Sequence, residues 1–231
     1  MNTKIYQADR VLLGMLVVLA FTLQLTTEAQ AAKRGWYVGG GSAASSVTEG
    51  LEGDGCYSRN NSCTNTVVVY PGKLEPGGGL ALQAGFRFSE GFSLDYFTAT
   101  TTHEAEHEAF AGETQEVGLF SGLLGPRFHF LMFGDVELFF RLGIGWYAVE
   151  YMNAAKVSGK SGLEKASFQG QGYGFGTGLE IFFDQIGLEF GYTQQNASLD
   201  TLTAGNEESS IDALEITFVS TNLSVLYHFG N

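Results

Sequence analysis

The chain has 231 residues and a formal net charge of −13 at neutral pH. Charged residues make up 16% of the sequence, compared with roughly 25% in soluble domains. An acidic surface repels the phosphates of nucleic acids, so nucleic acid is excluded as a partner.

The first 31 residues have the features of a secretory signal peptide. Lys4 and Arg10 precede the apolar run VLLGMLVVLAFTLQL at 11–25, and the small-residue sequence AQA follows at 29–31. The apolar run is short for a membrane-spanning helix, which needs about 20 residues, so an N-terminal anchor is the less favoured alternative. We therefore expect a cleaved signal peptide at 1–31 and one domain at 32–231.

Two cysteines, Cys56 and Cys63, lie close together in a polar stretch. An exported chain meets oxidising conditions, so we expect a small disulfide loop between them. A pair of free thiols is the alternative.

Alternation of apolar and polar residues dominates the rest of the chain, and helical periodicity is hard to find. The sequence therefore predicts an all-β fold of eight strands. They lie near 35–47, 79–88, 92–102, 115–130, 136–150, 168–183, 186–197 and 214–229.

The predicted connections alternate in length. Those at 89–91, 131–135 and 184–185 are short, whereas those at 48–78, 103–114, 151–167 and 198–213 are long and polar. Short and long connections therefore lie at opposite ends of the sheet. This layout is typical of an antiparallel up-and-down transmembrane β-barrel with short periplasmic turns and long extracellular loops.

Each predicted strand has one apolar face. At 136–150, for example, Leu138, Leu142 and Trp146 share a face opposite Glu137 and Arg141. Alternation by itself also fits a soluble lipocalin-like barrel, in which the apolar face turns inward.

The stretch QGQGYGFGTGLE at 169–180 favours the transmembrane alternative, because it has glycine at every second position from Gly170 to Gly178. Glycine weakens a strand and packs nothing on a surface exposed to water. In the narrow interior of an eight-stranded barrel, however, it leaves room for long side chains opposite. We therefore expect the glycines to face the lumen.

Ionisable residues share the face of the glycines. A buried charge needs a partner, and arginine binds carboxylates in a bidentate geometry, so we expect an ion-pair network that plugs the lumen. Solvated surface charges are the alternative. The residues are Arg87, Asp95, Arg127, His129, Glu137, Arg141, Glu180 and Glu189.

Three segments, GYGFGTGLEIFFDQIGLEFGY (172–192), GPRFHF (125–130) and LSVLYHF (223–229), resemble the OmpA-like family of small outer-membrane β-barrel domains. The resemblance covers nearly the whole mature chain and implies an eight-stranded barrel in the bacterial outer membrane. Relatives include membrane-tethering proteins, adhesins and complement-resistance proteins. The resemblance therefore implies an architecture but not a role.

The sequence HEAEH at 103–107 matches the zinc-protease pattern H-E-x-x-H, which requires a helix. It follows a threonine-rich strand, so we interpret it as part of an acidic loop. A lipid A-modifying enzyme would need a serine, a histidine and a carboxylate together on the lipid-facing wall, and no such set is evident. We expect no catalytic residues, no cofactor and no metal site.

The predicted function is that of a monomeric barrel with a plugged polar lumen, which displays acidic loops outside the cell. Its expected partners are outer-membrane lipid and lipopolysaccharide, and an extracellular protein that contacts the loops in an adhesin-like or resistance-like role. The alternatives are a small-solute channel, a lipid A-modifying enzyme and a periplasmic binder of apolar ligands.

Overall fold

The structure is a computed structural model that describes residues 34–49, 67–69, 74–106, 114–157 and 162–229. The predicted signal peptide at 1–31 and the pair Cys56 and Cys63 lie outside the described residues. Within the described ranges, no helix is long and apolar enough to cross a membrane. The strands are β1 (Gly35–Glu49), β2 (Val67–Val69), β3 (Gly77–Ser89), β4 (Phe92–Glu106), β5 (Thr114–Phe133), β6 (Val136–Val157), β7 (Leu163–Phe183), β8 (Ile186–Ala204) and β9 (Glu207–His228).

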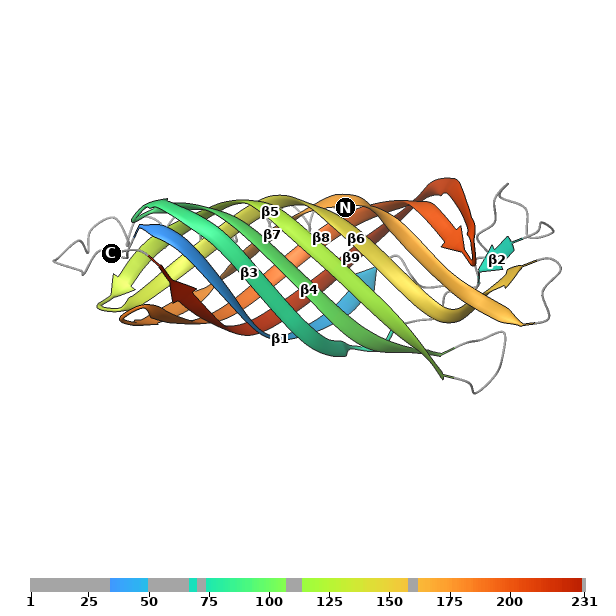
Figure 1. Cartoon of the computed structure of the whole chain (residues 1–231), viewed down its shortest axis with the longest axis horizontal. Coiled ribbons are helices and arrows are strands. Elements are labelled where there is room, and N and C mark those ends of the chain that lie inside the picture. The colour runs from blue at the N-terminus through green and yellow to red at the C-terminus, as the bar shows by residue number, and fades with distance from the viewer. Residues whose placement is uncertain (1–33, 50–66, 70–73, 107–113, 158–161, 230–231) are drawn as a thin grey trace, which may run out of the picture.

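Eight of these strands form a closed antiparallel ring, as the sequence predicts (Figure 1). Each strand pairs with its neighbour in the chain, and β9 closes the ring by pairing with β1. The short strand β2 pairs with the end of β6 outside the ring. A row of paired residues that starts at Tyr37 returns to β1 at Val47 after one circuit, and this stagger tilts all the strands.

One end of the barrel, the turn end, carries the short connections. Two-residue turns lie between β3 and β4, between β5 and β6, and between β7 and β8, where short connections were predicted. Gly134 and Asp184 have positive φ angles of 52° and 58°, a conformation that suits glycine and that aspartate tolerates. The Phe229 N–H donates to the Trp36 carbonyl over 2.8 Å, so both ends of the described chain lie here.

The other end, the loop end, contains more strand than predicted. The predicted loops at 151–167 and 198–213 are mostly strand, because β6 continues to Val157 and β8 and β9 meet at a turn around Gly205. Strands β6 to β9 have 19 to 22 residues, twice the roughly 9–11 that cross a bilayer. The barrel therefore extends beyond the region that lipid can cover.

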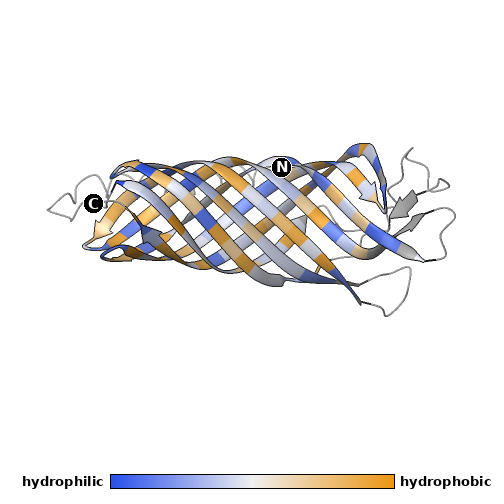
Figure 2. Cartoon of the chain, in the orientation of Figure 1, coloured by the Kyte–Doolittle hydropathy of each residue, from blue (hydrophilic) through white to orange (hydrophobic). Residues whose placement is uncertain are grey.

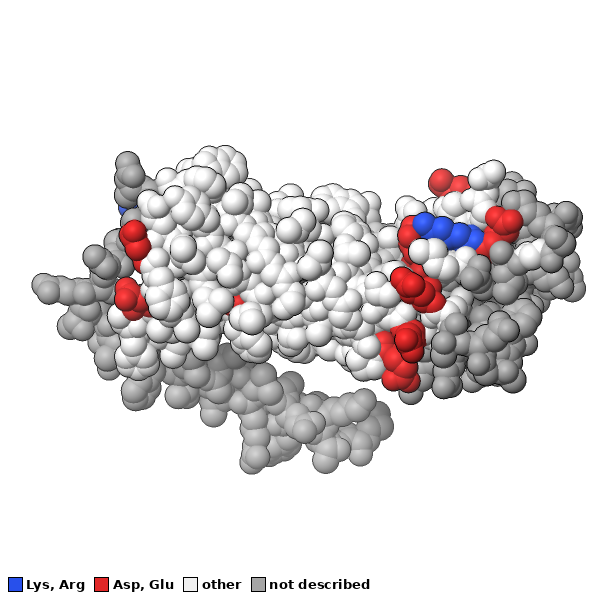
Figure 3. Space-filling model, turned by 60° about the horizontal axis from the view of Figure 1, so that its bottom comes forward, with Lys and Arg blue, Asp and Glu red and all other residues white. Residues whose placement is uncertain are grey.

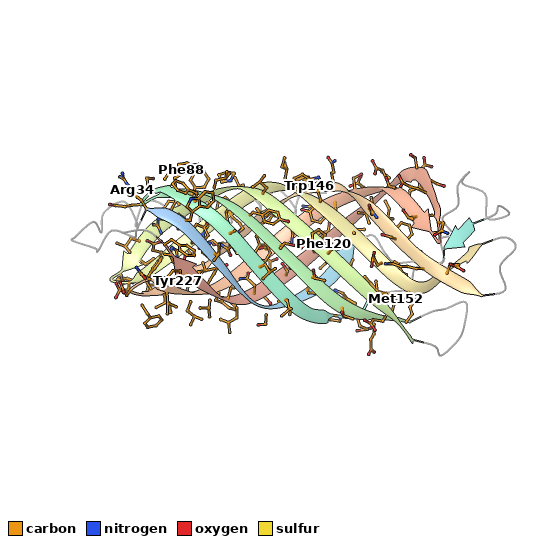
Figure 4. The ribbon with its side chains drawn as sticks, in the orientation of Figure 1. Arg34, Phe88, Phe120, Trp146, Met152 and Tyr227 are labelled. Carbon is orange, nitrogen blue, oxygen red and sulfur yellow. The ribbon has the colours of Figure 1, made fainter. Side chains whose placement is uncertain are left out.

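A band of large apolar side chains faces outward around the turn-end half of the barrel (Figure 4), and hydrophobic and hydrophilic residues alternate along the strands (Figure 2). Leu80, Ile144 and Trp36 are 70%, 67% and 63% exposed, and Ile144 lies on the face of β6 that the sequence predicts to be apolar. Charged side chains lie mainly toward the two ends, and the middle of the visible face carries almost none (Figure 3). A soluble lipocalin-like barrel would bury these apolar side chains, so that alternative is wrong.

Candidate functional site

The lumen of the turn-end half holds the eight ionisable residues that alternation places on the glycine face. They come from six consecutive strands, β3 to β8, and all are buried. Tyr37, Asn222 and His228 join them; alternation also predicts an inward His228, whereas the sequence analysis did not name Tyr37 and Asn222 as lumen residues. These three lie on the inward faces of β1 and β9, so the same alternation would have found them.

Arg127 lies at the centre of this cluster and is fully buried. Its Nη1 donates to Glu189 Oε2 over 2.7 Å, and its Nη2 donates to Glu180 Oε2 over 2.8 Å. The guanidinium also stacks over the ring of Phe139, 3.9 Å from the ring centroid. One arginine therefore joins carboxylates from β7 and β8 across the lumen.

A second arginine, Arg87, closes the turn end. Its two terminal nitrogens donate to the two oxygens of Glu137, each over 2.9 Å, in the bidentate geometry that favours arginine over lysine. Arg87 also donates to the carbonyls of Ser89 and Glu90. His129 Nδ1 lies 3.3 Å from Glu137 Oε2, which extends this group to β5.

The third arginine, Arg141, lies on the loop-end side of Arg127. Its Nη2 donates to Glu189 Oε1 over 3.1 Å and to Gln83 Oε1 over 3.2 Å. Its Nε lies 3.4 Å from Asp95 Oδ2, and Asp95 accepts a bond of 2.9 Å from the Tyr37 hydroxyl. Glu189 is therefore shared by two arginines.

The side chains of His129, Glu137 and Glu180 offer ligand atoms within 4.8 Å of one another, a spacing that a metal ion can bridge. Both carboxylates already have cationic partners, however, since Glu137 binds Arg87 and Glu180 binds Arg127. Glu180 also lies 2.8 Å from His228 Nε2. The arginines neutralise the carboxylates here, so the cluster does not require a metal.

Glycines on β7 make room for the long side chains. A Cβ added to Gly176 would lie 3.0 Å from Arg141 Cγ, and one added to Gly178 would lie 2.6 Å from the ring of Phe139. Both distances are shorter than an ordinary carbon–carbon contact. The glycine stripe therefore provides the volume that the buried arginines and their stacking partner occupy.

The loop-end half of the lumen differs from the predicted polar lumen, because it is packed with apolar side chains. Two ring pairs lie here, Tyr147 with Phe218 at 5.4 Å and Tyr151 with Phe168 at 6.0 Å between centroids. The cluster consists of Leu74, Ala105, Val117, Leu119, Tyr147, Val149, Tyr151, Ala166, Phe168, Ala197, Leu199, Leu202, Ala204, Ile216 and Phe218. The charged side chains thus gather in the turn-end half, whereas apolar side chains make up most of the packing in the loop-end half.

The apolar face changes sides along individual strands. On β6, the outward row of large apolar residues ends at Trp146, with the exposed Met152 as an isolated exception further on, and Tyr147 is the first inward residue of the apolar cluster. On β5, Phe120 likewise ends the outward apolar row, and its neighbour Leu119 lies in the inward apolar cluster. On the turn-end side of this level, apolar side chains face outward and polar ones inward, as in a membrane barrel. On the loop-end side, apolar side chains face inward and polar ones outward, as in a water-soluble barrel.

The HEAEH sequence lies in strand β4 as far as Glu106, and not in the predicted loop, while His107 lies outside the described residues. His103 points inward and Glu104 outward, so the two cannot act on one zinc-bound water. His103 Nδ1 donates to the Glu75 carbonyl over 2.8 Å, and Nε2 lies 3.0 Å from the Ser45 hydroxyl. The hydrogen bonds of His103 therefore join β4 to neighbouring segments, which is a structural role.

An eight-stranded ring with an apolar outer band and a charged interior defines an outer-membrane β-barrel. The chain belongs to the family described as outer membrane protein beta-barrel domain, whose model matches residues 13–229. It therefore lies in the bacterial outer membrane. In such barrels the short turns face the periplasm, so the loop end is extracellular.

Several solved outer-membrane proteins are similar to this chain. OprG from Pseudomonas aeruginosa is 10% identical, with a TM-score of 0.56, and the alignment covers 88% of this chain and 100% of that one. Neisserial surface protein A is 13% identical with a TM-score of 0.49, covering 86% and 99%. Ail of Yersinia pestis is 14% identical with a TM-score of 0.46, covering 85% and 99%. No curated protein sequence matches the chain significantly.

Removing the central arginine should destabilise the barrel strongly. Arg127→Met leaves Glu180 and Glu189 without their main counter-ion, so we expect a loss of about 3–5 kcal/mol in the free energy of unfolding. The double variant Arg127→Met/Glu189→Gln should recover part of this loss. Urea-induced unfolding in lipid vesicles, followed by tryptophan fluorescence, measures both.

The matched control for this experiment is Lys165→Met. Lys165 pairs with Glu150 over 2.8 Å, but both side chains are substantially exposed, 50% and 39%. Such a pair contributes about 0–1 kcal/mol. Equal losses for Arg127→Met and Lys165→Met would contradict a tightly coupled network in the lumen.

Proposed function

We propose that the protein is a closed, monomeric surface-interaction barrel, with an adhesin-like or resistance-like role at its extracellular end. The observation that carries this proposal is that both halves of the lumen are filled with side chains. Paired charges around Arg127 fill the periplasmic half, and packed rings such as Tyr147 and Phe218 fill the extracellular half. A barrel filled in this way serves better as a rigid frame for recognition than as a conduit.

The extracellular extension supports a role in recognition through charge. Its outer wall carries exposed carboxylates, and Glu104 lies directly opposite Glu116 on the neighbouring strand. Like charges that face each other across a strand pair cost stability, so a basic partner would relieve this cost. The exposed carboxylates of the extension include Glu104, Glu116, Asp200, Glu208, Asp212 and Glu215.

We further propose that the protein is not an enzyme. The three histidines in the described ranges, His103, His129 and His228, are all buried on the inward face. A lipid A-modifying enzyme would need such a base on the lipid-facing wall.

Within the wider family we also propose an OmpA-like affiliation, which the eight-stranded ring supports. We propose lipopolysaccharide as the lipid partner in the outer leaflet.

Planar-bilayer recording tests whether the barrel is closed. The folded protein should produce no reproducible current steps in potassium chloride, because paired charges and packed rings fill the two halves of the described lumen. A general porin in the same bilayer is the positive control. Stable steps whose size changes in Arg141→Ala would support the small-solute channel and contradict the closed barrel.

A loop deletion tests the site of recognition. Removing residues 51–66, between β1 and β2, should leave a barrel that still migrates faster on unheated than on heated gels. Adherence of bacteria that display this variant to serum-coated surfaces should fall to the level of the host strain. A variant with Asn-Gly in place of the Glu90–Gly91 turn, at the periplasmic end, is the control. Undiminished adherence of the deletion variant would contradict recognition through this loop.

A further inference from the structure

A groove of about 300 Å³ lies on the outer wall of the barrel, formed by β7, β8 and β9. It is lined by two rows of residues paired across these strands. One row is Tyr173, Asn196 and Thr217, and the other is Gln171, Ser198 and Glu215. The volume is at the lower end of the range for small-molecule sites.

Irregular strand pairing borders the groove on its extracellular side. The register between β7 and β8 shifts at Gln169 and Gly170, and the register between β8 and β9 shifts at Leu199 and Thr201. Such bulges bend a strand and re-aim its side chains. Below them, a Cβ at Gly172 would lie 2.7 Å from Ala197 Cα, so β7 and β8 approach closely beneath the groove.

The groove lies immediately above the lipid-facing band. On β7 the next outward residue toward the periplasm is Phe175, and on β9 it is Val219. Tyr173 is 62% exposed and marks the upper edge of the band on β7, where aromatic residues favour the membrane–water interface. The groove is therefore at the height of the headgroups of the outer leaflet.

The lining is suited to a neutral sugar. The Tyr173 ring offers an electron-rich face on which the C–H groups of a sugar can stack. Around it lie two amides, two hydroxyls and one carboxylate, which together both donate and accept hydrogen bonds. Thr217 Oγ1 donates to Asn196 Oδ1 over 2.9 Å, which orients the amide and leaves its Nδ2 group for another acceptor.

Other ligand classes fit less well. Among the described residues, no lysine or arginine lines the groove, and Glu215 would repel a phosphate. An acyl chain would have to dehydrate the amides and the carboxylate without replacing their hydrogen bonds. Hydroxyl groups on a ring satisfy these polar groups and also cover the aromatic face.

We propose that this groove binds a neutral sugar in the headgroup of an outer-leaflet glycolipid, stacked on Tyr173 and bonded to Asn196 and Glu215. The assignment rests on the proposed lipopolysaccharide partner, but it is independent of the loops and of the proposed surface-interaction role. It places the glycolipid against β7 to β9, one sector of the wall, rather than around the whole barrel.

Binding of the full chain in detergent micelles to three probes tests the proposal. The probes are lipopolysaccharide with its core sugars, lipid A without them, and the released core oligosaccharide. We expect the protein to prefer lipopolysaccharide over lipid A by about tenfold. Tyr173→Ala/Asn196→Ala should abolish this preference, whereas Tyr192→Ala, which removes an outward tyrosine outside the groove, should retain it.

Ser198→Trp provides a second variant, which fills the groove while leaving Tyr173, Asn196 and Glu215 in place, and it should also abolish the preference. Equal binding of lipopolysaccharide and lipid A by the unmodified protein would overturn the sugar site. Binding of the released oligosaccharide as tight as that of lipopolysaccharide would overturn the lipid source and indicate a site for free carbohydrate. Loss of the preference in Tyr192→Ala would overturn the location.

Discussion

The barrel depends on the pairing of charges in a space too narrow for water to solvate them. Arg127 is fully buried and is held by Glu180 and Glu189 from two neighbouring strands. Without such partners, a charge at this position would cost several kcal/mol. The ring can therefore close around these residues only if the strand register brings opposite charges together, and the glycines of β7 supply the room for them.

Each long strand turns its apolar face outward in one half of the barrel and inward in the other half. In the periplasmic half, apolar residues such as Ile144 face lipid while the arginines fill the lumen. In the extracellular half, residues such as Phe218 turn the apolar face inward, and polar residues meet water. The barrel thus projects a rigid extension beyond the membrane. Both the acidic surface and the groove beside Tyr173 belong to the part of the wall above the lipid band.

Local sequence patterns predict most of the membrane half, because period-2 alternation and short turns involve neighbouring residues. The ring of eight strands, the outward faces and the positions of the turns follow from them. The sequence analysis did not predict the extension, because the Thr, Ser and acidic residues on its outer face are typical of a loop. Inward apolar residues such as Leu199 and Leu202 were therefore assigned to the loop at 198–213. The pairing of Arg127 with two glutamates depends on the stagger of the whole ring, which no local pattern contains.

Single nitroxide labels along β6 test the central claim most directly, namely that apolar side chains face lipid while charges and glycines fill a closed interior. Labels at Leu138 and Ile144 should be reached by oxygen dissolved in lipid, and a label at Gly143 should be shielded. A label at Glu150 should instead be reached by a water-soluble nickel chelate, because it lies above the apolar band. Shielding at Leu138 together with oxygen access at Gly143 would contradict the account.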